Sequence, residues 1–260
     1  MKKYLFDRLR EISNKIRNTD YILLCLDYDG TLVPICKNPS LAKLSSETKE
    51  LLTDLSQNPC ISMDIISGRS LNEIKKLIGV ENILYAGNHG FEISYKENCW
   101  VHPEAERTKP ILKNVVKELK AQLNTIDGVL IEDKGLTLSI HYRNVVGKSA
   151  KDIKKIIQDI VNLYRETLRI TSGKKVYEVR PKINWDKGKA IIKMQQMLNL
   201  KEEILKVYIG DDKTDEDAFK ILREDDISIV VGYKKYSKAH YFCKSSKEVV
   251  LFLRHLKSLY

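Results

Sequence analysis

The 260-residue sequence lacks any apolar run long enough for a membrane helix, which needs about 20 residues. Its first 17 residues place Leu5, Leu9, Ile12 and Ile16 between charged side chains. This pattern predicts an amphipathic surface helix over residues 1–17, because a secretory signal would need a continuous apolar block. We therefore expect a cytoplasmic protein that does not bind membranes.

Cysteine is also scarce, and the thiols are scattered along the chain. The five positions are Cys25, Cys36, Cys60, Cys99 and Cys243. The number is odd, and no two have the short spacing of a zinc site or a redox motif. We expect free thiols in a reducing compartment.

Acidic residues are fewer than basic ones, 35 against 45, which gives a net charge of +10. Residues 107–180 hold sixteen Lys and Arg but only eight Asp and Glu, so most of the excess lies there. A solvated helical face would explain part of this charge, and an anionic substrate would explain it too. Few aromatics accompany the basic residues and no known module is present, so we do not expect nucleic acid as a partner.

Strands and helices alternate over the first hundred residues. An apolar run at residues 21–26 suits a strand buried on both faces of a parallel sheet. Helices are expected at 45–57 and 70–78, and strands at 62–66 and 83–86. The pattern resumes after residue 181 with a helix at 186–198 and strands at 206–209 and 227–231. This order predicts an α/β fold with a doubly wound, mostly parallel, Rossmann-like sheet.

Residues 107–180 follow a different pattern, in which a helix and two strands occur twice. The helices are expected at 111–123 and 151–164, and the strands at 129–132, 136–142, 168–171 and 175–179. We interpret this segment as an inserted α+β domain with an antiparallel sheet and helices on one face. The expected domains are thus 1–106, 107–180 and 181–260, with Pro103, Pro110 and Pro181 near the boundaries.

Two carboxylates, Asp27 and Asp29, follow the first buried strand, and Gly30 then permits a sharp turn. Ligands bind at the carboxyl ends of strands in open α/β sheets. Because two ionised carboxylates repel each other, a cation is expected between them, and Mg²⁺ prefers oxygen ligands. The alternative is an Asx-type turn with only a local role.

Three later segments place polar groups at similar positions. Ser67-Gly68-Arg69 follows a strand, and Ser70 with Glu73 forms a capping-box pattern for the next helix. Lys187 lies in the first turn of a helix that Asp186 would cap. Residues 211–217 contain five acids after another strand, which favours a cation site, and Thr214 would cap the helix that follows.

Together these four segments resemble, in order, the four motifs of the haloacid dehalogenase superfamily of phosphohydrolases. The inserted domain resembles that superfamily's C2-type cap, which lies between the second and third motifs. Further stretches are similar to trehalose-6-phosphate phosphatases. They are Gly87–Glu92, Glu132–Lys134, His141–Arg143, Glu178–Pro181, Asp186–Gly188 and Gly210–Phe219.

The resemblance implies an enzyme, a phosphoric monoester hydrolase of trehalose biosynthesis that forms an aspartyl-phosphate. Asp27 would be the nucleophile, Asp29 the general acid and base, and Lys187 a catalytic cation. Thr31, Ser67 and Arg69, with Lys187, would bind the phosphate. The Mg²⁺ site is expected to use Asp27, Asp29, Asp211, Asp212 and Asp215.

The resemblance also points to four substrate-binding residues of the inserted domain, namely Glu132, Lys134, Arg143 and Glu178. Charged side chains suit sugar hydroxyls, although surface ion pairs are the alternative. Other sugar phosphates, such as sucrose phosphate or mannosyl-3-phosphoglycerate, remain alternative substrates. A phospho-acceptor regulatory domain or a silent sugar-phosphate-binding module is a further alternative. We expect a small-molecule substrate and a monomer.

Overall fold

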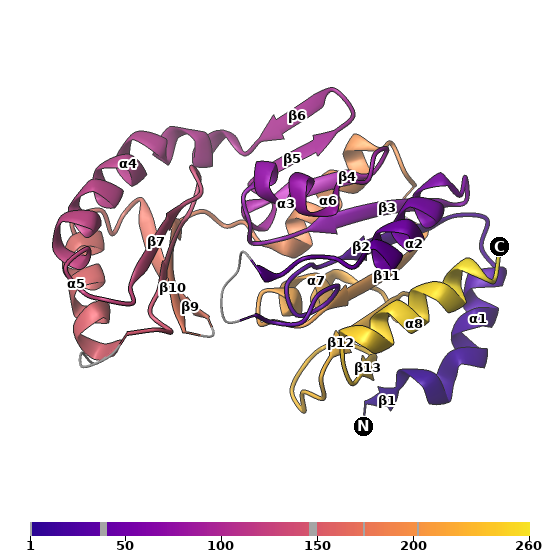
Figure 1. Cartoon of the computed structure of the whole chain (residues 1–260). Helices are drawn as coiled ribbons and strands as arrows, with labels where there is room; N and C mark the ends of the chain where they lie inside the picture. The colour runs from indigo at the N-terminus through magenta and orange to yellow at the C-terminus, as the bar shows by residue number, and fades with distance from the viewer. Residues whose placement is uncertain (1, 37–40, 146–149, 174, 202) are drawn as a thin grey trace. The chain divides into compact units, whose positions relative to one another are not determined.

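The computed structural model describes residues 2–36, 41–145, 150–173, 175–201 and 203–260, and the chain divides into two compact units (Figure 1). Unit 1 comprises Met1–Trp100 and Trp185–Tyr260, and unit 2 is the insertion Val101–Asn184. The residues expected at the boundaries, 107 and 180, both lie within unit 2. Helix α4 (Pro103–Leu123) begins before residue 107, and strand β10 (Val176–Pro181) continues past residue 180.

Within the described residues, unit 1 contains a nine-stranded sheet in the order β1-β13-β12-β11-β2-β3-β4-β5-β6. Its strands are β1 (Lys3–Tyr4), β2 (Ile22–Leu26), β3 (Ile61–Ile66), β4 (Leu84–Gly87), β5 (Glu92–Tyr95), β6 (Asn98–Val101), β11 (Leu205–Gly210), β12 (Ile227–Val231) and β13 (Tyr241–Cys243). All neighbours from β1 to β4 pair in parallel, whereas β5 runs antiparallel to β4. The mostly parallel sheet predicted from the sequence is confirmed.

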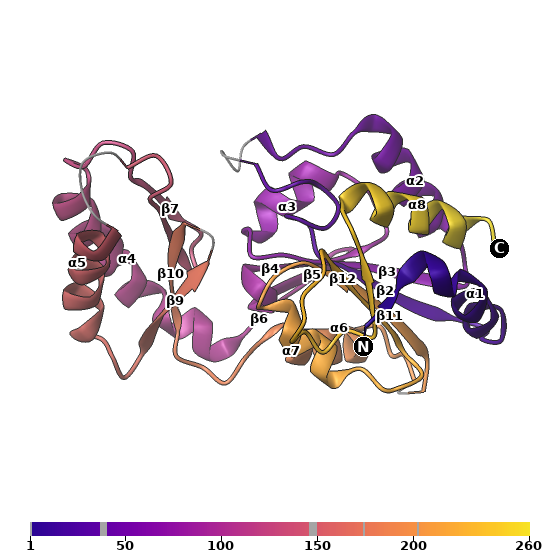
Figure 2. The same cartoon turned by 90° about the horizontal axis from the view of Figure 1, so that it is seen from below.

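Helices cover both faces of this sheet (Figures 1 and 2). They are α1 (Leu9–Arg17), α2 (Ser46–Gln57), α3 (Leu71–Ile78) and α8 (Ser246–Lys257) on one face, and α6 (Lys187–Met197) and α7 (Asp215–Ile221) on the other. Strand β2 is buried on both sides, because Ile22, Leu24 and Leu26 pack in the first core and Leu23 and Cys25 in the second. This three-layer arrangement places the polar residues that follow β2 at the edge of a rigid core.

Side-chain caps fix two of the helices next to the strand ends. The Ser70 hydroxyl accepts a hydrogen bond from the backbone N–H of residue 73, and Asp186 caps α6 in the same way. The cap predicted at Thr214 is wrong, because its backbone is helical and its side chain makes no cap hydrogen bond. Asp215 instead accepts the backbone N–H of Asp212.

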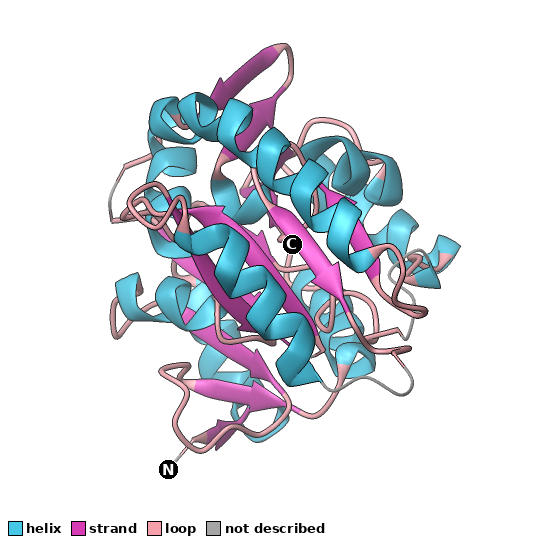
Figure 3. Ribbon diagram, turned by 90° about the vertical axis from the view of Figure 1, so that its left-hand side faces the viewer, coloured by secondary structure: helices cyan, strands magenta, loops and turns pink. Residues whose placement is uncertain are grey.

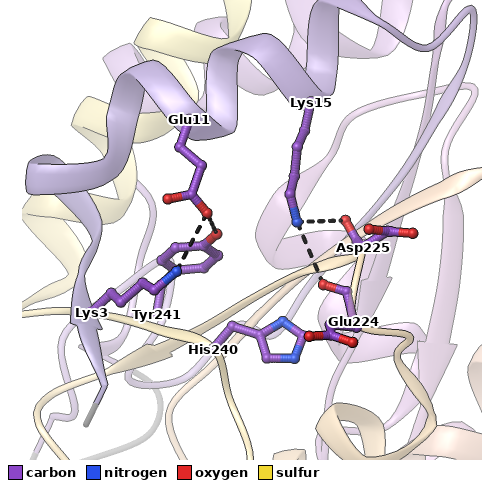
Figure 4. A pocket seen from close by; sticks show the side chains of 7 residues that line it. All are labelled: Lys3, Glu11, Lys15, Glu224, Asp225, His240 and Tyr241. Carbon is purple, nitrogen blue, oxygen red and sulfur yellow. Dashed lines mark hydrogen bonds and ion pairs between the residues drawn. The ribbon is translucent and has the colours of Figure 1, made fainter.

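The N-terminal segment differs from the single helix expected over residues 1–17. It forms strand β1, a 3₁₀ turn at Leu5–Arg8 and then α1. A cavity of about 340 Å³ lies where α1 meets the loops around β12 and β13 (Figure 4). There the Tyr241 hydroxyl donates to Glu11 at 2.9 Å, and Lys15 Nζ donates to the backbone carbonyls of Glu224 and Asp225. These bonds, together with the pairing of β1 and β13, tie the segment to unit 1.

Unit 2 contains a four-stranded antiparallel sheet in the order β7-β8-β10-β9 among its described residues. Its further elements are β7 (Leu130–Asp133), β8 (Leu138–His141), α5 (Ala150–Asn162) and β9 (Leu168–Gly173). Helices α4 and α5 cover one face, as predicted (Figures 1 and 3). Pro110 lies inside α4 rather than at a boundary, and Pro103 begins that helix, where proline is tolerated.

Among the described residues, no helix combines the length and the apolar composition that crossing a bilayer requires.

Candidate active site

Three acidic side chains converge at the carboxyl ends of β2 and β11. These strands pair in parallel, and the Asp27 N–H donates to the Ile209 carbonyl at 3.0 Å. Carboxylate oxygens of Asp27, Asp211 and Asp215 all lie within 4.8 Å of one another, and all three residues are buried. Gly30, at φ +89°, lets the chain pass this cluster, since a Cβ there would lie 2.3 Å from Asp211 Cγ.

Lys187 connects two of these carboxylates. Its Nζ lies 2.7 Å from Asp27 Oδ1 and 2.6 Å from Asp215 Oδ1, and the lysine is 2% exposed. Asp215 Oδ1 also accepts the Tyr208 hydroxyl at 2.7 Å, and Asp215 Oδ2 accepts the Asp212 N–H at 2.7 Å. The first turn of α6 and the loop after β11 are thus joined through one buried carboxylate.

Burial and charge act in opposite directions on these groups. Burial raises the pKa of Asp27 well above its usual value, and Lys187 offsets only part of this effect because Asp215 and Asp211 add negative charge. Burial would lower the pKa of Lys187, but the two carboxylates raise it. Burial would raise the pKa of Asp215, but the charge of Lys187 and hydrogen bonds from Lys187, the Asp212 N–H and the Tyr208 hydroxyl bring it below its usual value. The lysine therefore stays charged in this site.

The cluster suits a divalent cation. The carboxylates of Asp27, Asp211 and Asp215 lie close together in a buried place, and Lys187 pairs with two of them. Carboxylates this close repel one another, which favours a cation among them. Its oxygen ligands are those that Mg²⁺ prefers. Within the described part of the chain, the carboxylates of Asp29 and Asp212 do not belong to this cluster.

Thr31 and Ser67 lie close to the same strand ends. The buried Thr31 hydroxyl donates to Asp27 Oδ2 at 3.0 Å, so Lys187 and Thr31 hold the two oxygens of that carboxylate. Ser67 is 1% exposed and follows β3, and its hydroxyl accepts the backbone N–H of Arg69 at 3.2 Å. The turn after β3 therefore has a fixed conformation.

Arg69 forms a two-pronged ion pair with Asp29. Arg69 Nε lies 2.7 Å from Asp29 Oδ2 and Nη2 lies 2.8 Å from Oδ1, which is the bidentate geometry of strong arginine–carboxylate pairs. Arg69 Nη1 also donates to Glu73, and the guanidinium lies over the Tyr28 ring, 5.5 Å from its centroid. The Asp29 carboxylate is thus held by an arginine that is itself 95% buried.

Charged residues of unit 2 gather on the sheet face opposite its helices. Glu132 and Glu178 both pair in register with Ser139 of β8, so they lie in one row across the strands. Lys134 Nζ lies 3.6 Å from Glu178 Oε1. Arg143, which follows β8, is exposed. The structure therefore brings Glu132, Lys134 and Glu178 together on this face.

Two further residues of this face were not singled out in the sequence. His141 Nε2 lies 3.0 Å from Glu132 Oε2, and Arg180 Nε lies 3.8 Å from Glu178 Oε2. The alternation of Glu178 and Arg180 along a strand would have placed both on one face.

Comparison with known proteins identifies the family. The trehalose-phosphatase family model matches residues 25–249. The chain belongs to the trehalose-phosphatase family. Similar proteins include rice "probable trehalose-phosphate phosphatase 2", 35% identical over 263 residues, and Arabidopsis thaliana "trehalose-phosphate phosphatase B", 34% identical over 250 residues. These alignments cover 91% and 90% of this chain and 68% and 66% of those proteins, respectively.

A solved structure shows the same fold in this family. The C-terminal domain of the C. albicans trehalose-6-phosphate phosphatase matches with a TM-score of 0.84 and 24% identity, over 100% of this chain and 99% of that one. A haloacid dehalogenase-like hydrolase from Bacteroides thetaiotaomicron matches with a TM-score of 0.66 and 16% identity, over 91% and 99%. The predicted haloacid dehalogenase-like fold is therefore confirmed.

Proposed function

We propose that this member of the trehalose-phosphatase family hydrolyses trehalose 6-phosphate to trehalose and inorganic phosphate with the help of Mg²⁺. The carboxylate of Asp27 carries this proposal. It is buried at a strand end, fixed by Lys187 and Thr31, and lies within an acidic cluster suited to a cation. The family match supports the choice of substrate.

The reaction proceeds in two steps. An oxygen of Asp27 attacks phosphorus, the bond from phosphorus to the sugar oxygen breaks, and Asp29 gives that oxygen a proton. Water then attacks the aspartyl-phosphate, Asp29 accepts its proton, and the bond to Asp27 breaks to release phosphate. Atoms and charges balance, and both residues return to their starting states.

Charge on the transferring phosphoryl group is neutralised by fixed donors. Lys187 has three N–H donors, and among the described residues Asp27 and Asp215 accept two of them, so the third is available for a phosphate oxygen. The Ser67 hydroxyl is a further donor, whereas the Thr31 hydroxyl gives its one proton to Asp27 and would have to turn away from it to bind phosphate. Mg²⁺ held by Asp27, Asp211 and Asp215 would supply additional positive charge. Such stabilisation is the main requirement of phosphoryl transfer.

Arg69 acts on Asp29 in this proposal. Its guanidinium binds both oxygens of the Asp29 carboxylate and also pairs with Glu73, so it fixes where Asp29 lies. Because a carboxylate in this pair carries no proton, Asp29 would take up a proton and give up one of the two hydrogen bonds before it acts as the general acid. The guanidinium has five N–H donors and these bonds use three of them, so a contact of Arg69 with phosphate stays a prediction.

The sheet face of unit 2 would recognise the sugar. Glu132, Lys134, Arg143 and Glu178 carry groups that bind hydroxyls through charge-assisted hydrogen bonds. His141 and Arg180 would hold the two glutamates in place. Selectivity among phosphate esters would then reside in unit 2.

Phosphate release from a panel of sugar phosphates tests this function. We expect trehalose 6-phosphate to be hydrolysed with the highest kcat/KM, and activity to stop with EDTA and return with Mg²⁺. Asp27→Asn should remove activity while the circular dichroism spectrum stays unchanged. A preference for sucrose phosphate or another ester would overturn the substrate assignment, and an active Asp27→Asn variant would overturn the mechanism.

A further inference from the structure

Tyr208 lies in the middle of β11 with its ring in the apolar core and its hydroxyl in the acidic cluster. The residue is fully buried, and its ring packs edge-on against Phe219, with the centroids 5.5 Å apart. Its hydroxyl donates to Asp215 Oδ1 at 2.7 Å, the same oxygen that accepts Lys187 Nζ at 2.6 Å. The Tyr208 hydroxyl therefore has a specific hydrogen-bond partner, so this residue does more than fill the core with its ring.

Asp215 carries the effect of this hydroxyl to Lys187. The Asp212 N–H donates to Asp215 Oδ2 and the Tyr208 hydroxyl donates to Asp215 Oδ1, so both carboxylate oxygens are held by groups other than Lys187. The ammonium then lies between this fixed oxygen and Asp27 Oδ1. Without the Tyr208 hydroxyl, the Asp215 carboxylate could rotate about the hydrogen bond that its Oδ2 accepts from Asp212. Lys187 Nζ would then move together with Asp215 Oδ1.

We infer that Tyr208 is a positioning residue that fixes Lys187 against Asp27 through Asp215. This inference rests on the proposed roles of Asp27 and Lys187. The Tyr208 hydroxyl donates its proton to Asp215 and not to Asp27 or Lys187. Burial in the core keeps Tyr208 away from the substrate. It should therefore affect kcat more than KM.

The test compares Tyr208→Phe with Tyr85→Phe. Tyr85 is a buried tyrosine of β4 whose hydroxyl donates to the Val80 carbonyl at 2.7 Å and accepts the Val80 N–H at 3.2 Å, so its variant loses two buried hydrogen bonds but none in the acidic cluster. Both variants keep the aromatic ring, and assays are run at a temperature where thermal melting shows both to be folded. A hydrogen bond to a charged group is worth about tenfold or more in rate, so Tyr208→Phe should lower kcat for trehalose 6-phosphate about tenfold or more with little change in KM.

Nuclear magnetic resonance follows the ammonium of Lys187 directly, in the absence of substrate. The ¹H–¹⁵N signal of its ammonium, assigned by its loss in Lys187→Arg, should shift and exchange faster with water in Tyr208→Phe but not in Tyr85→Phe. Equal kcat in the two variants, or an unchanged Lys187 signal in Tyr208→Phe, would overturn the inference. Activity retained in Asp27→Asn would instead reject the proposed function on which it rests.

Discussion

At the scale of single residues, buried acids in unit 1 have two different environments. Asp27 and Asp215 have lysine and hydroxyl partners at the strand ends. Asp64, in the middle of β3, is fully buried, and neither carboxylate oxygen has a hydrogen-bond partner among the described residues. Burial therefore raises the pKa of Asp64 well above its usual value. The first two acids belong to the acidic cluster of the candidate active site, whereas we expect buried Asp64 to reduce stability once it is ionised.

Asp64→Asn should stabilise the protein, and the gain should increase with pH. The unfolded-state pKa of Asp is about 3.9 and the folded-state pKa is higher, so the unfolded state loses its proton first. Between these two values the free energy of unfolding falls by about 1.4 kcal/mol per pH unit as pH rises. Urea unfolding of the wild type and of Asp64→Asn at pH 5, 6 and 7 measures the difference between their free energies of unfolding. The exposed Asp20→Asn is the control, and a gain that is the same at all three pH values would contradict the explanation.

Arg69→Lys and Asp29→Asn should both slow hydrolysis more for an ester with a poor leaving group than for an ester with a good one. The bidentate pair with Asp29 needs the planar guanidinium, so lysine would leave the general acid poorly aimed. Asp29→Asn should slow trehalose 6-phosphate hydrolysis by about 10²–10⁴-fold, and Arg69→Lys by less. Release of p-nitrophenol from p-nitrophenyl phosphate in the first turnover should fall much less in both, because this leaving group needs little protonation. A parallel loss with both substrates in Arg69→Lys would indicate phosphate binding instead.

At the scale of elements, the N-terminal segment is part of the core of unit 1. Leu5, Ile12 and Ile16 are fully buried, and β1 extends the sheet beside β13. The Ser13 hydroxyl lies 2.8 Å from His255 Nε2, which joins α1 to α8. These contacts are far from the strand ends that bear Asp27 and Asp211, so the segment should contribute stability and not catalysis.

Ile12→Ala should lower the free energy of unfolding by about 2–5 kcal/mol, because it leaves a cavity in a packed core. The activity of the folded fraction should be unchanged. Chemical denaturation and kcat measured on the same samples check both statements, with the exposed Asn14→Ala as the control on the same helix. Similar stability in the two variants would show that α1 is only loosely attached.

At the scale of the whole molecule, the two units have separate tasks in the proposed reaction. Unit 1 carries the phosphate chemistry at its strand ends, and unit 2 carries a charged sheet face with Glu132, Lys134 and Glu178. The excess of basic residues within 107–180 would attract an anionic ester toward unit 2. Substitutions on the two units should therefore have different effects on substrates with and without a sugar.

Glu178→Gln tests this division of tasks. Loss of its charge-assisted contacts should reduce kcat/KM for trehalose 6-phosphate by about tenfold or more. Hydrolysis of p-nitrophenyl phosphate should change little, because that ester has no sugar to bind. Glu166→Gln removes an exposed carboxylate from the same unit and is the matched control. Equal losses for both esters in Glu178→Gln would show that this residue only supports the fold.

Much of the fold and the gathering of acidic residues at the strand ends were predictable from the sequence. Asp27, Asp211 and Asp215 follow apolar strand patterns, and parallel strands bring their ends to one edge of a sheet. The short strands β1 and β13 were missed because two or three residues give no periodic signal. The contact of Tyr208 with Asp215 was missed because a tyrosine within an apolar strand pattern is typical of a core position.

The most direct test of the account is to identify the residue that receives the phosphoryl group. Asp29→Asn should still react with p-nitrophenyl phosphate, whose leaving group needs little protonation, but should release phosphate slowly because it lacks the general base. After acid quench, borohydride reduction and proteolysis, mass spectrometry should find homoserine at position 27, and the variant that also carries Asp27→Asn should give none. An unmodified Asp27, or reduction at another acid, would contradict the account.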